Sequence, residues 1–167
     1  DGGGIYSDGE SFLSVSGSEF LKNEALGDWS NGGGIAAMGR QTLTLRTSTF
    51  HDNYAAVGGA VTVHKEAVAV IEDCIIENNG RRVVNGVVVA VSAQGGGVQF
   101  SGSAGQSMAR CLIRNNEASQ YGGGLYVKPS SNVTLTLDSC VIADNVSGNL
   151  GGGIHQASDG GKLQLIN

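Results

Sequence analysis

Apolar and polar residues alternate along short stretches of this chain, and such stretches recur at intervals. Clear examples are Leu43-Thr44-Leu45, Leu135-Thr136-Leu137 and Leu163-Gln164-Leu165. A period of two, with apolar residues on one face only, is typical of a half-buried β-strand and not of a helix. The pattern therefore predicts an all-β chain built from many short strands.

Two short motifs lie between these stretches and mark an internal repeat. The first is a glycine run followed by an aliphatic residue, at Gly2–Ile5, Gly32–Ile35, Gly58–Val61, Gly95–Val98, Gly122–Leu125 and Gly151–Ile154. The second is Ser/Cys-x-Phe/Ile-x-x-Asn, which spans Ser18–Asn23, Ser48–Asn53, Cys74–Asn79, Cys111–Asn116 and Cys140–Asn145. Self-similarity at such a period indicates a repeat architecture.

The spacing of the motifs divides each repeat into a fixed half and a variable half. The third residue of the glycine motif and the following Ser or Cys are 14 positions apart in the first four repeats, and 16 apart from Gly124 to Cys140, an interval that contains Pro129. The distance from the Asn to the next glycine motif varies between repeats. This behaviour is typical of a solenoid coil with one turn that accepts insertions.

Each coil holds three short strands joined by turns too tight for a hairpin, so each strand must pair with its equivalent in the next coil. We therefore predict a right-handed parallel β-helix with three sheets and about five to six coils. The coils start near residues 2, 32, 58, 95, 122 and 151, and the whole chain, 1–167, is one β-helix segment with no caps visible.

Equivalent residues in successive coils should stack into ladders. We predict a structural ladder of hydrogen-bonded carboxamides from Asn23, Asn53, Asn79, Asn116 and Asn145. Cys74, Cys111 and Cys140 share one register in three consecutive coils, where they form either a buried thiol ladder or one strained disulfide with a leftover thiol.

The longest insertion, residues 80–94, carries a hairpin signal. Asn85-Gly86 stands between two valine runs, which favours a two-residue turn. The insertion is either an exposed contact surface or a flap folded over a neighbouring coil. Its candidate contact residues are Arg81, Arg82, Val83, Val84, Val87, Val88 and Val89.

The two motifs resemble the repeats of the chlamydial polymorphic outer membrane proteins, which carry GG[A/L/I/V][I/L/V/Y] and FxxN. The matching residues are the six glycine motifs together with Phe20–Asn23 and Phe50–Asn53, while the later coils use Ile in place of Phe. The resemblance covers essentially the whole chain and implies an extracellular, often adhesive β-helix. The membrane-anchoring part of that family is not carried over to this chain.

Composition and charge exclude several classes of function. The chain has 28 Gly, one Pro and a formal net charge of −5, so it offers no basic field for nucleic acid. No apolar run is long enough for a transmembrane helix, and this segment is not expected to insert into a membrane. The chain starts without Met or a signal peptide, so we expect a mature or internal piece of a longer protein.

No catalytic, metal or cofactor site is predicted. The outward positions of the first and second strands hold no stacked carboxylates, and the acidic residues Glu72, Asp73 and Asp138 are interleaved with Arg46 and Arg110 at a turn. The three His residues fall at different phases of the coil and are expected on the surface.

Two N-glycosylation sequons are present, and they differ in their surroundings. Asn132 lies in the lengthened turn after Pro129 and is the better candidate for a glycan, whereas the Asn145 amide should be occupied by the ladder. A glycan on either residue would require secretion from a eukaryotic cell.

We expect a non-enzymatic, structural or adhesive protein outside the cell or on its surface. It would be a fragment of a larger surface protein or a filament subunit, with partners that are further copies stacked end to end, or host or matrix glycans and proteins. The alternative is a non-catalytic part of a carbohydrate-active β-helix. If function is local, it should lie on the variable turn.

Overall fold

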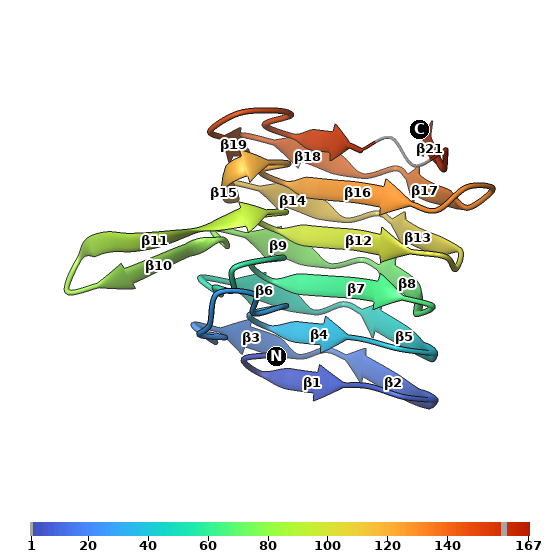
Figure 1. The fold of residues 1–167 in the computed structure, drawn as a ribbon, viewed down its shortest axis with the longest axis horizontal. Coiled ribbons are helices and arrows are strands. Elements are labelled where there is room, and N and C mark those ends of the chain that lie inside the picture. Colours follow the sequence, from blue (N-terminus) through green and yellow to red (C-terminus); the bar gives the residue numbers. More distant parts are fainter. Residues whose placement is uncertain (1, 158–159) are drawn as a thin grey trace.

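The computed structural model describes residues 2–157 and 160–167, and these residues form a solenoid of stacked strands without any helix (Figure 1). No helix in the described part of the chain is therefore available to cross a membrane. The first sheet takes one strand from each of six coils. Its strands, in order, are β1 (Ile5–Ser7), β4 (Ile35–Ala37), β7 (Val61–Lys65), β12 (Val98–Gly102), β16 (Leu125–Pro129) and β20 (Ile154–Gln156).

Two further parallel sheets complete the solenoid, so the predicted parallel β-helix of about six coils is confirmed. The second sheet consists of β2 (Ser11–Ser16), β5 (Gln41–Arg46), β8 (Val68–Glu72), β13 (Gln106–Ala109), β17 (Thr134–Asp138) and β21 (Lys162–Ile166). The third consists of β3 (Glu19–Leu21), β6 (Thr49–His51), β9 (Ile75–Glu77), β14 (Leu112–Arg114) and β18 (Val141–Ala143). Equivalent residues pair directly, as Leu13 does with Leu43.

A fourth, smaller sheet was not predicted. It contains β10 (Arg81–Val84), β11 (Val87–Gln94), β15 (Glu117–Tyr121) and β19 (Val146–Ser147), in that order. All four strands come from segments between an Asn and the next glycine motif. The variable segments of coils 3, 4 and 5 are thus long enough to pair with one another, which sequence spacing alone does not reveal.

Sharp turns with left-handed backbone separate the strands of each coil. The first glycine of the motif has positive φ from the second coil onward, for example 56° at Gly32. The second glycine is required for a different reason, because a Cβ on Gly33 would collide with the carbonyl oxygen of Gly59 in the next coil. Close stacking of coils therefore depends on the absence of a side chain at this place.

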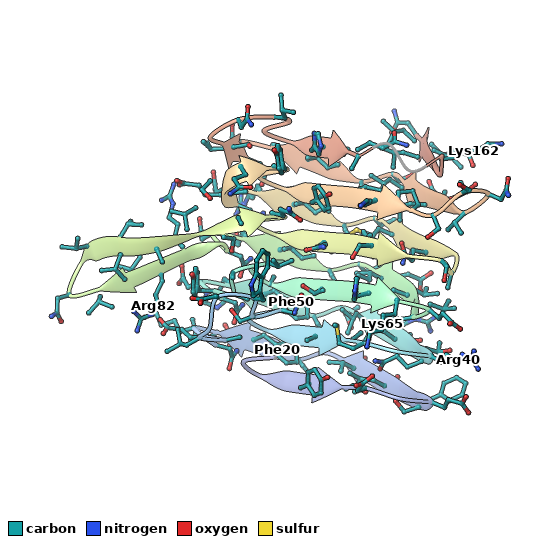
Figure 2. All side chains as sticks on the ribbon, viewed as in Figure 1. Phe20, Arg40, Phe50, Lys65, Arg82 and Lys162 are labelled. Atoms are coloured by element: carbon teal, nitrogen blue, oxygen red, sulfur yellow. The ribbon has the colours of Figure 1, made fainter. Side chains whose placement is uncertain are left out.

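The core is a continuous column of aliphatic and aromatic side chains between the three sheets. Leu43, Leu45 and Ile71 are fully buried, and Phe50 stacks on Phe20 with ring centroids 4.7 Å apart and planes 4° from parallel (Figure 2). Parallel stacking brings like residues into contact in successive coils. This repeated packing buries apolar surface in every coil and stabilises the solenoid.

Outward positions of the first sheet are less accessible than alternation suggests. Ala36, Thr62, Gln99 and Tyr126 occupy the outward column, yet none is more than 8% exposed. Neighbours one strand away, about 4.8 Å above and below, shield each member of the column. The Thr62 hydroxyl in addition donates to the carbonyl of Val57 and accepts from the N–H of Gly32. Only Tyr6, in the first coil, is largely open at 46%.

Candidate functional site

The five repeat Asn residues form one hydrogen-bonded ladder inside the solenoid, beside the variable segments. Asn79 shows the pattern: its Oδ1 accepts from the backbone N–H and the Nδ2 of Asn53 at 2.9 and 3.0 Å. Its own Nδ2 donates to Oδ1 of Asn116 at 3.0 Å and to the carbonyl of Phe50 at 2.9 Å. The ladder supplies hydrogen-bond partners for the buried amides, and it links each coil to the next at the same position.

The ladder residues follow the third-sheet strands and do not lie within them. β6 ends at His51, and Asn53 comes two residues later. The residue before each ladder Asn is left-handed, as at Asp52 with φ 57° and Asn78 with φ 57°. The chain there turns out of the coil into the segment that we call the variable corner, made of residues 24–31, 54–57, 80–94, 117–121 and 146–150.

The longest part of the variable corner is a projecting hairpin. Residues 81–91 of β10 and β11, which we call the arm, pair antiparallel with Val84 opposite Val87 and Val83 opposite Val88. Asn85 and Gly86 both have positive φ, 50° and 77°, as a two-residue hairpin turn requires. Figure 1 shows the arm extending away from the coils, so it does not fold over a neighbour.

The base of the arm is anchored by buried polar contacts. The N–H of Gly80 donates to the carbonyl of Asn53 at 2.9 Å, and the N–H of Ser92 donates to the carbonyl of Gly80 at 2.7 Å. The Ser92 hydroxyl donates to the carbonyl of Ala55 at 2.5 Å and is fully buried. The arm therefore leaves the solenoid from a fixed base.

The two arginines at the start of the arm are paired within the chain. Arg82 Nε lies 2.9 Å from Glu24 Oε2, and Arg81 pairs with Glu117. Both partners belong to the variable corner of other coils. Arg81 and Arg82 were predicted as contact residues of the insertion. In the structure they also fix the arm to the solenoid through these ion pairs.

Exposed apolar side chains gather on the variable corner. Those on the arm are the predicted contact residues Val83, Val84, Val87, Val88 and Val89, and the other segments add Leu26, Trp29, Val146 and Leu150. Trp29 is 85% exposed on the loop 24–31. Sequence analysis missed this residue, although a single Trp inside a variable segment was an available signal. Clustered exposed apolar residues mark a contact surface.

Two polar hollows flank Arg81 at the base of the arm. One, of about 390 Å³, is lined by Lys22, Glu24, Asp52, Asn78, Arg81 and Val83. The other, of about 340 Å³, is lined by Asn78, Arg81, Asn115, Asn116, Asp144 and Val146. The apolar arm thus stands between two concave surfaces that carry charges of both signs.

The two glycosylation sequons lie in different surroundings. Asn132 is exposed with φ 69° in the turn closed by the N–H of Val133 and the carbonyl of Ser130. Asn145 is in the ladder: its Nδ2 donates to the carbonyl of Ile113, and its Oδ1 accepts from Asn116. A glycan on Asn145 would disrupt these hydrogen bonds, whereas one on Asn132 would extend into solvent.

The three cysteines stack in consecutive coils as free thiols, the first of the two arrangements left open by the sequence. Cys74 and Cys111 are buried, and their thiols donate to the carbonyls of Glu72 and Ala109 at 3.2 and 3.3 Å. Hydrogen bonding to the neighbouring thiols and burial raise the pKa of Cys111 far above its ordinary value. Cys111 therefore remains a protonated core residue.

The acidic residues at the second turn are held in ion pairs. Arg46 lies 3.0 Å from Glu72, and Arg110 contacts both carboxylate oxygens of Asp73 at 2.7 and 2.9 Å. The hydrogen bonds from Arg110 lower the pKa of Asp73. In the part of the chain that the structure describes, no three His, Cys, Asp or Glu side chains converge on a possible metal position.

The three histidines have separate partners. His51 Nε2 lies 2.7 Å from Glu19 Oε1, and this hydrogen bond raises the pKa of His51. His64 Nδ1 lies 2.7 Å from the Ser101 hydroxyl. His155 stacks on Tyr126 and Tyr121, with ring centroids 5.6 and 5.0 Å apart. His155, Tyr126 and Tyr121 make a small aromatic cluster where the first sheet (β16 and β20) meets the end of β15.

Comparison with known families agrees with this architecture. The family model described as "Right handed beta helix region" matches residues 1–167. Comparisons with curated proteins and with solved structures found no significant match.

Proposed function

Because the chain belongs to the right-handed β-helix family, we propose that it is a structural or adhesive β-helix of the cell exterior that binds partners through its variable corner. The observation that carries the proposal is the gathering of exposed Trp29, Leu26 and the arm valines on this one part of the solenoid. Such a surface is typical of a protein contact site. The resemblance to adhesive surface repeats points the same way.

A binding role without catalysis is supported by the state of the acidic side chains. Polysaccharide hydrolysis needs two carboxyl groups that face the same substrate bond. Here Glu72, Asp73 and Glu77 each pair with an arginine one coil away. These contacts orient the carboxylates along the coil stack, where they stabilise neighbouring turns.

The test compares binding and turnover for the same protein. The purified chain is applied to arrays of glycans and of extracellular matrix proteins, and Trp29→Ala should weaken the binding at least tenfold. Phe12→Ala is the matched control, because Phe12 is 88% exposed but lies on β2, away from the corner. Binding that Trp29→Ala leaves unchanged, or release of reducing or unsaturated ends from a polysaccharide, would overturn the proposal.

One observation favours a second candidate function, carbohydrate binding as the non-catalytic part of a polysaccharide-active protein. The rings of Tyr126 on β16, His155 on β20 and Tyr121 at the end of β15 cluster together, with Tyr126 buried and the other two partly exposed. Aromatic rings offer flat apolar faces beside polar groups, which suits sugar rings. In the same array, a loss of glycan binding in Tyr121→Ala but not in Trp29→Ala would favour this candidate.

A further inference from the structure

The arm is a two-stranded ribbon without a third strand. β15 joins β11 only at Ser92 and Gln94, so the part from Arg81 to Val91 lies beyond that sheet. β10 is the edge strand of its sheet. The valines on both faces are open, with Val83 at 51%, Val87 at 62% and Val89 at 51% exposed. An isolated hairpin of this kind is marginally stable in water, and a further strand would stabilise it.

The arm also lacks the features that protect exposed strands. No charged residue and no proline occurs from Val83 to Ala93. Edge strands that must stay unpaired usually carry Lys, Pro or an inward charge. β10 carries Arg81 and Arg82 at its base, but its outer half, Val83-Val84, is β-branched and uncharged and is suited to pair with another strand through its backbone.

Charge and symmetry identify the additional strand. Arg81 and Arg82 are already neutralised by Glu117 and Glu24, so the arm offers no free charge to select a charged partner. A strand pairs antiparallel with its own copy about a two-fold axis, and an axis between Val83 and Val84 brings the apolar ends of the two strands together. Val83 and Val84 then lie beside the same residues of the second copy.

We propose that the arm is a dimerisation element, in which β10 pairs antiparallel with β10 of a second copy of this chain. The result is a continuous four-stranded sheet in the order β11, β10, β10 and β11. This inference rests on the proposed function only in taking the variable corner as a contact surface, and it names the partner for one part of that surface.

The hollow beside β10 fits this arrangement. In an antiparallel pair, the Asn85-Gly86 turn of one arm reaches the base of the other arm. That base carries the hollow of about 390 Å³ with Lys22, Asp52 and Asn78 in its lining. A polar turn thus meets polar walls, while the valines meet valines. Donors and acceptors on both sides allow the turn amide to be hydrogen-bonded.

The short strand sets the strength of the dimer. β10 has only four residues, so we expect the paired arms to bury less than roughly 1,200 Å² of surface. Interfaces of that size are typical of weak, transient complexes. We therefore expect an equilibrium that depends on concentration, with a dissociation constant in the micromolar range or above. Each arm projects from the fixed base of its own solenoid, so the paired arms would hold the two solenoids apart.

The test uses sedimentation equilibrium of the purified chain, from roughly 1 μM to 1 mM. The chain should pass from monomer to dimer, and Val83→Lys should raise the dissociation constant at least tenfold. Val141→Lys is the matched control, since Val141 is 57% exposed against 51% for Val83 but lies on β18 of the third sheet. Far-UV circular dichroism should show that both variants keep the fold.

Hydrogen exchange gives a second measurement on the unmodified chain. Amides in residues 81–84 should gain protection as the concentration rises, while those of β18 should not. A chain that stays monomeric throughout, or a dimer that Val83→Lys leaves unchanged, would overturn this inference. If Trp29→Ala still weakens partner binding in that case, the proposed function stands and only the self-pairing of the arm fails.

Discussion

Single positions show where the repeat is obeyed and where it is broken. Leu13, Leu43, Leu135 and Leu163 occupy one inward column of the second sheet, and Gln106 replaces leucine in the fourth coil. Gln106 is 4% exposed, and neither its Nε2 nor its Oε1 has a hydrogen-bond partner among the described residues. A buried amide without partners destabilises the folded chain relative to an apolar residue of the same size.

We therefore predict that Gln106→Leu raises the free energy of unfolding by about 1–2 kcal/mol, measured by urea denaturation. Leucine is the residue that four of the other five coils use, and the neighbour in the third coil is the small Ala69, so the column has room for its shape. Gln41→Leu is the matched control, because Gln41 is equally buried but its Nε2 donates to the carbonyls of Ser7 and Met38, both at 2.6 Å. That variant should lose stability. A loss in Gln106→Leu would show that the amide is satisfied in the folded protein.

Single residues could be placed from the sequence where the same residue type recurs in successive coils, and could not where it occurs in one coil only. Asn53 and Asn79 were assigned to a ladder because the same amide recurs at one register, and the structure pairs them at 3.0 Å. Trp29 and Gln106 have no equivalent in other coils, so periodicity is silent about them. Glu24 was missed for the same reason, since its pairing with Arg82 depends on the lengths of two unrelated segments.

Short strands depend on contacts between coils, and the third sheet shows this at the level of elements. β3, β6, β9, β14 and β18 have three residues each. Ion pairs link their outward positions along the stack. His51 on β6 contacts Glu19 on β3, and Arg114 on β14 contacts Glu77 on β9 at 2.7 Å. Exposed pairs of this kind contribute little singly, but they set the register of strands that are too short to fix it alone.

The His51–Glu19 pair should make the contact between β3 and β6 depend on pH. The hydrogen bond to Glu19 raises the pKa of His51 above 6.5, with a smaller effect from Asp52. A raised pKa means that the stabilisation is complete below pH 6.5, the ordinary value, and is lost as the pH rises through the folded-state pKa. Titration of the imidazole by NMR should give a value above 6.5.

Two substitutions separate the contributions to this titration. Glu19→Gln should lower the pKa of His51 most, because it removes the larger interaction. Asp52→Asn keeps a residue that tolerates the left-handed backbone at this position and should lower the pKa less. Equal effects of the two variants, or none, would contradict the pairing of β3 with β6 through these side chains.

Elements were predictable in kind but not always in position. The valine runs around Asn85-Gly86 predicted a hairpin, and the structure contains it. Its direction depends on Ser92 and its contact with the carbonyl of Ala55, which comes from another coil. The fourth sheet was missed because β15 and β19 lie in segments of unequal length, where no period can be read.

On the scale of the whole molecule, the chain is a rigid stack with one adaptable side. The glycine motif and the Asn ladder set where each coil begins and where its third strand ends, so both were readable from spacing. Between these points the length of the variable corner is free, because a loop outside the stack costs little closure entropy. Because length varies only in the variable corner, that corner can hold the Trp29 loop and the arm while the strands of the three sheets keep their register.

The separation predicts that the arm can be removed without unfolding the solenoid. Replacing residues 80–94 with residues 54–57, the four-residue corner of the second coil, keeps Asn79 in the ladder and Gly95 in its motif. The variant should retain its strand spectrum by circular dichroism and lose no more than about 1 kcal/mol of unfolding free energy, as for other surface changes.

The control places a small change in the fixed half of a coil. One alanine inserted after Val70, within β8, shifts Ile71 from the core face to the solvent face and reverses every later residue of the strand. This one inserted alanine should unfold the chain or lower its melting temperature steeply. The corner replacement changes many more residues and should not. If the corner replacement unfolds the chain instead, the base of the arm is part of what holds the second and third coils together, through Gly80 and Ser92, and its role as a separate contact element is wrong.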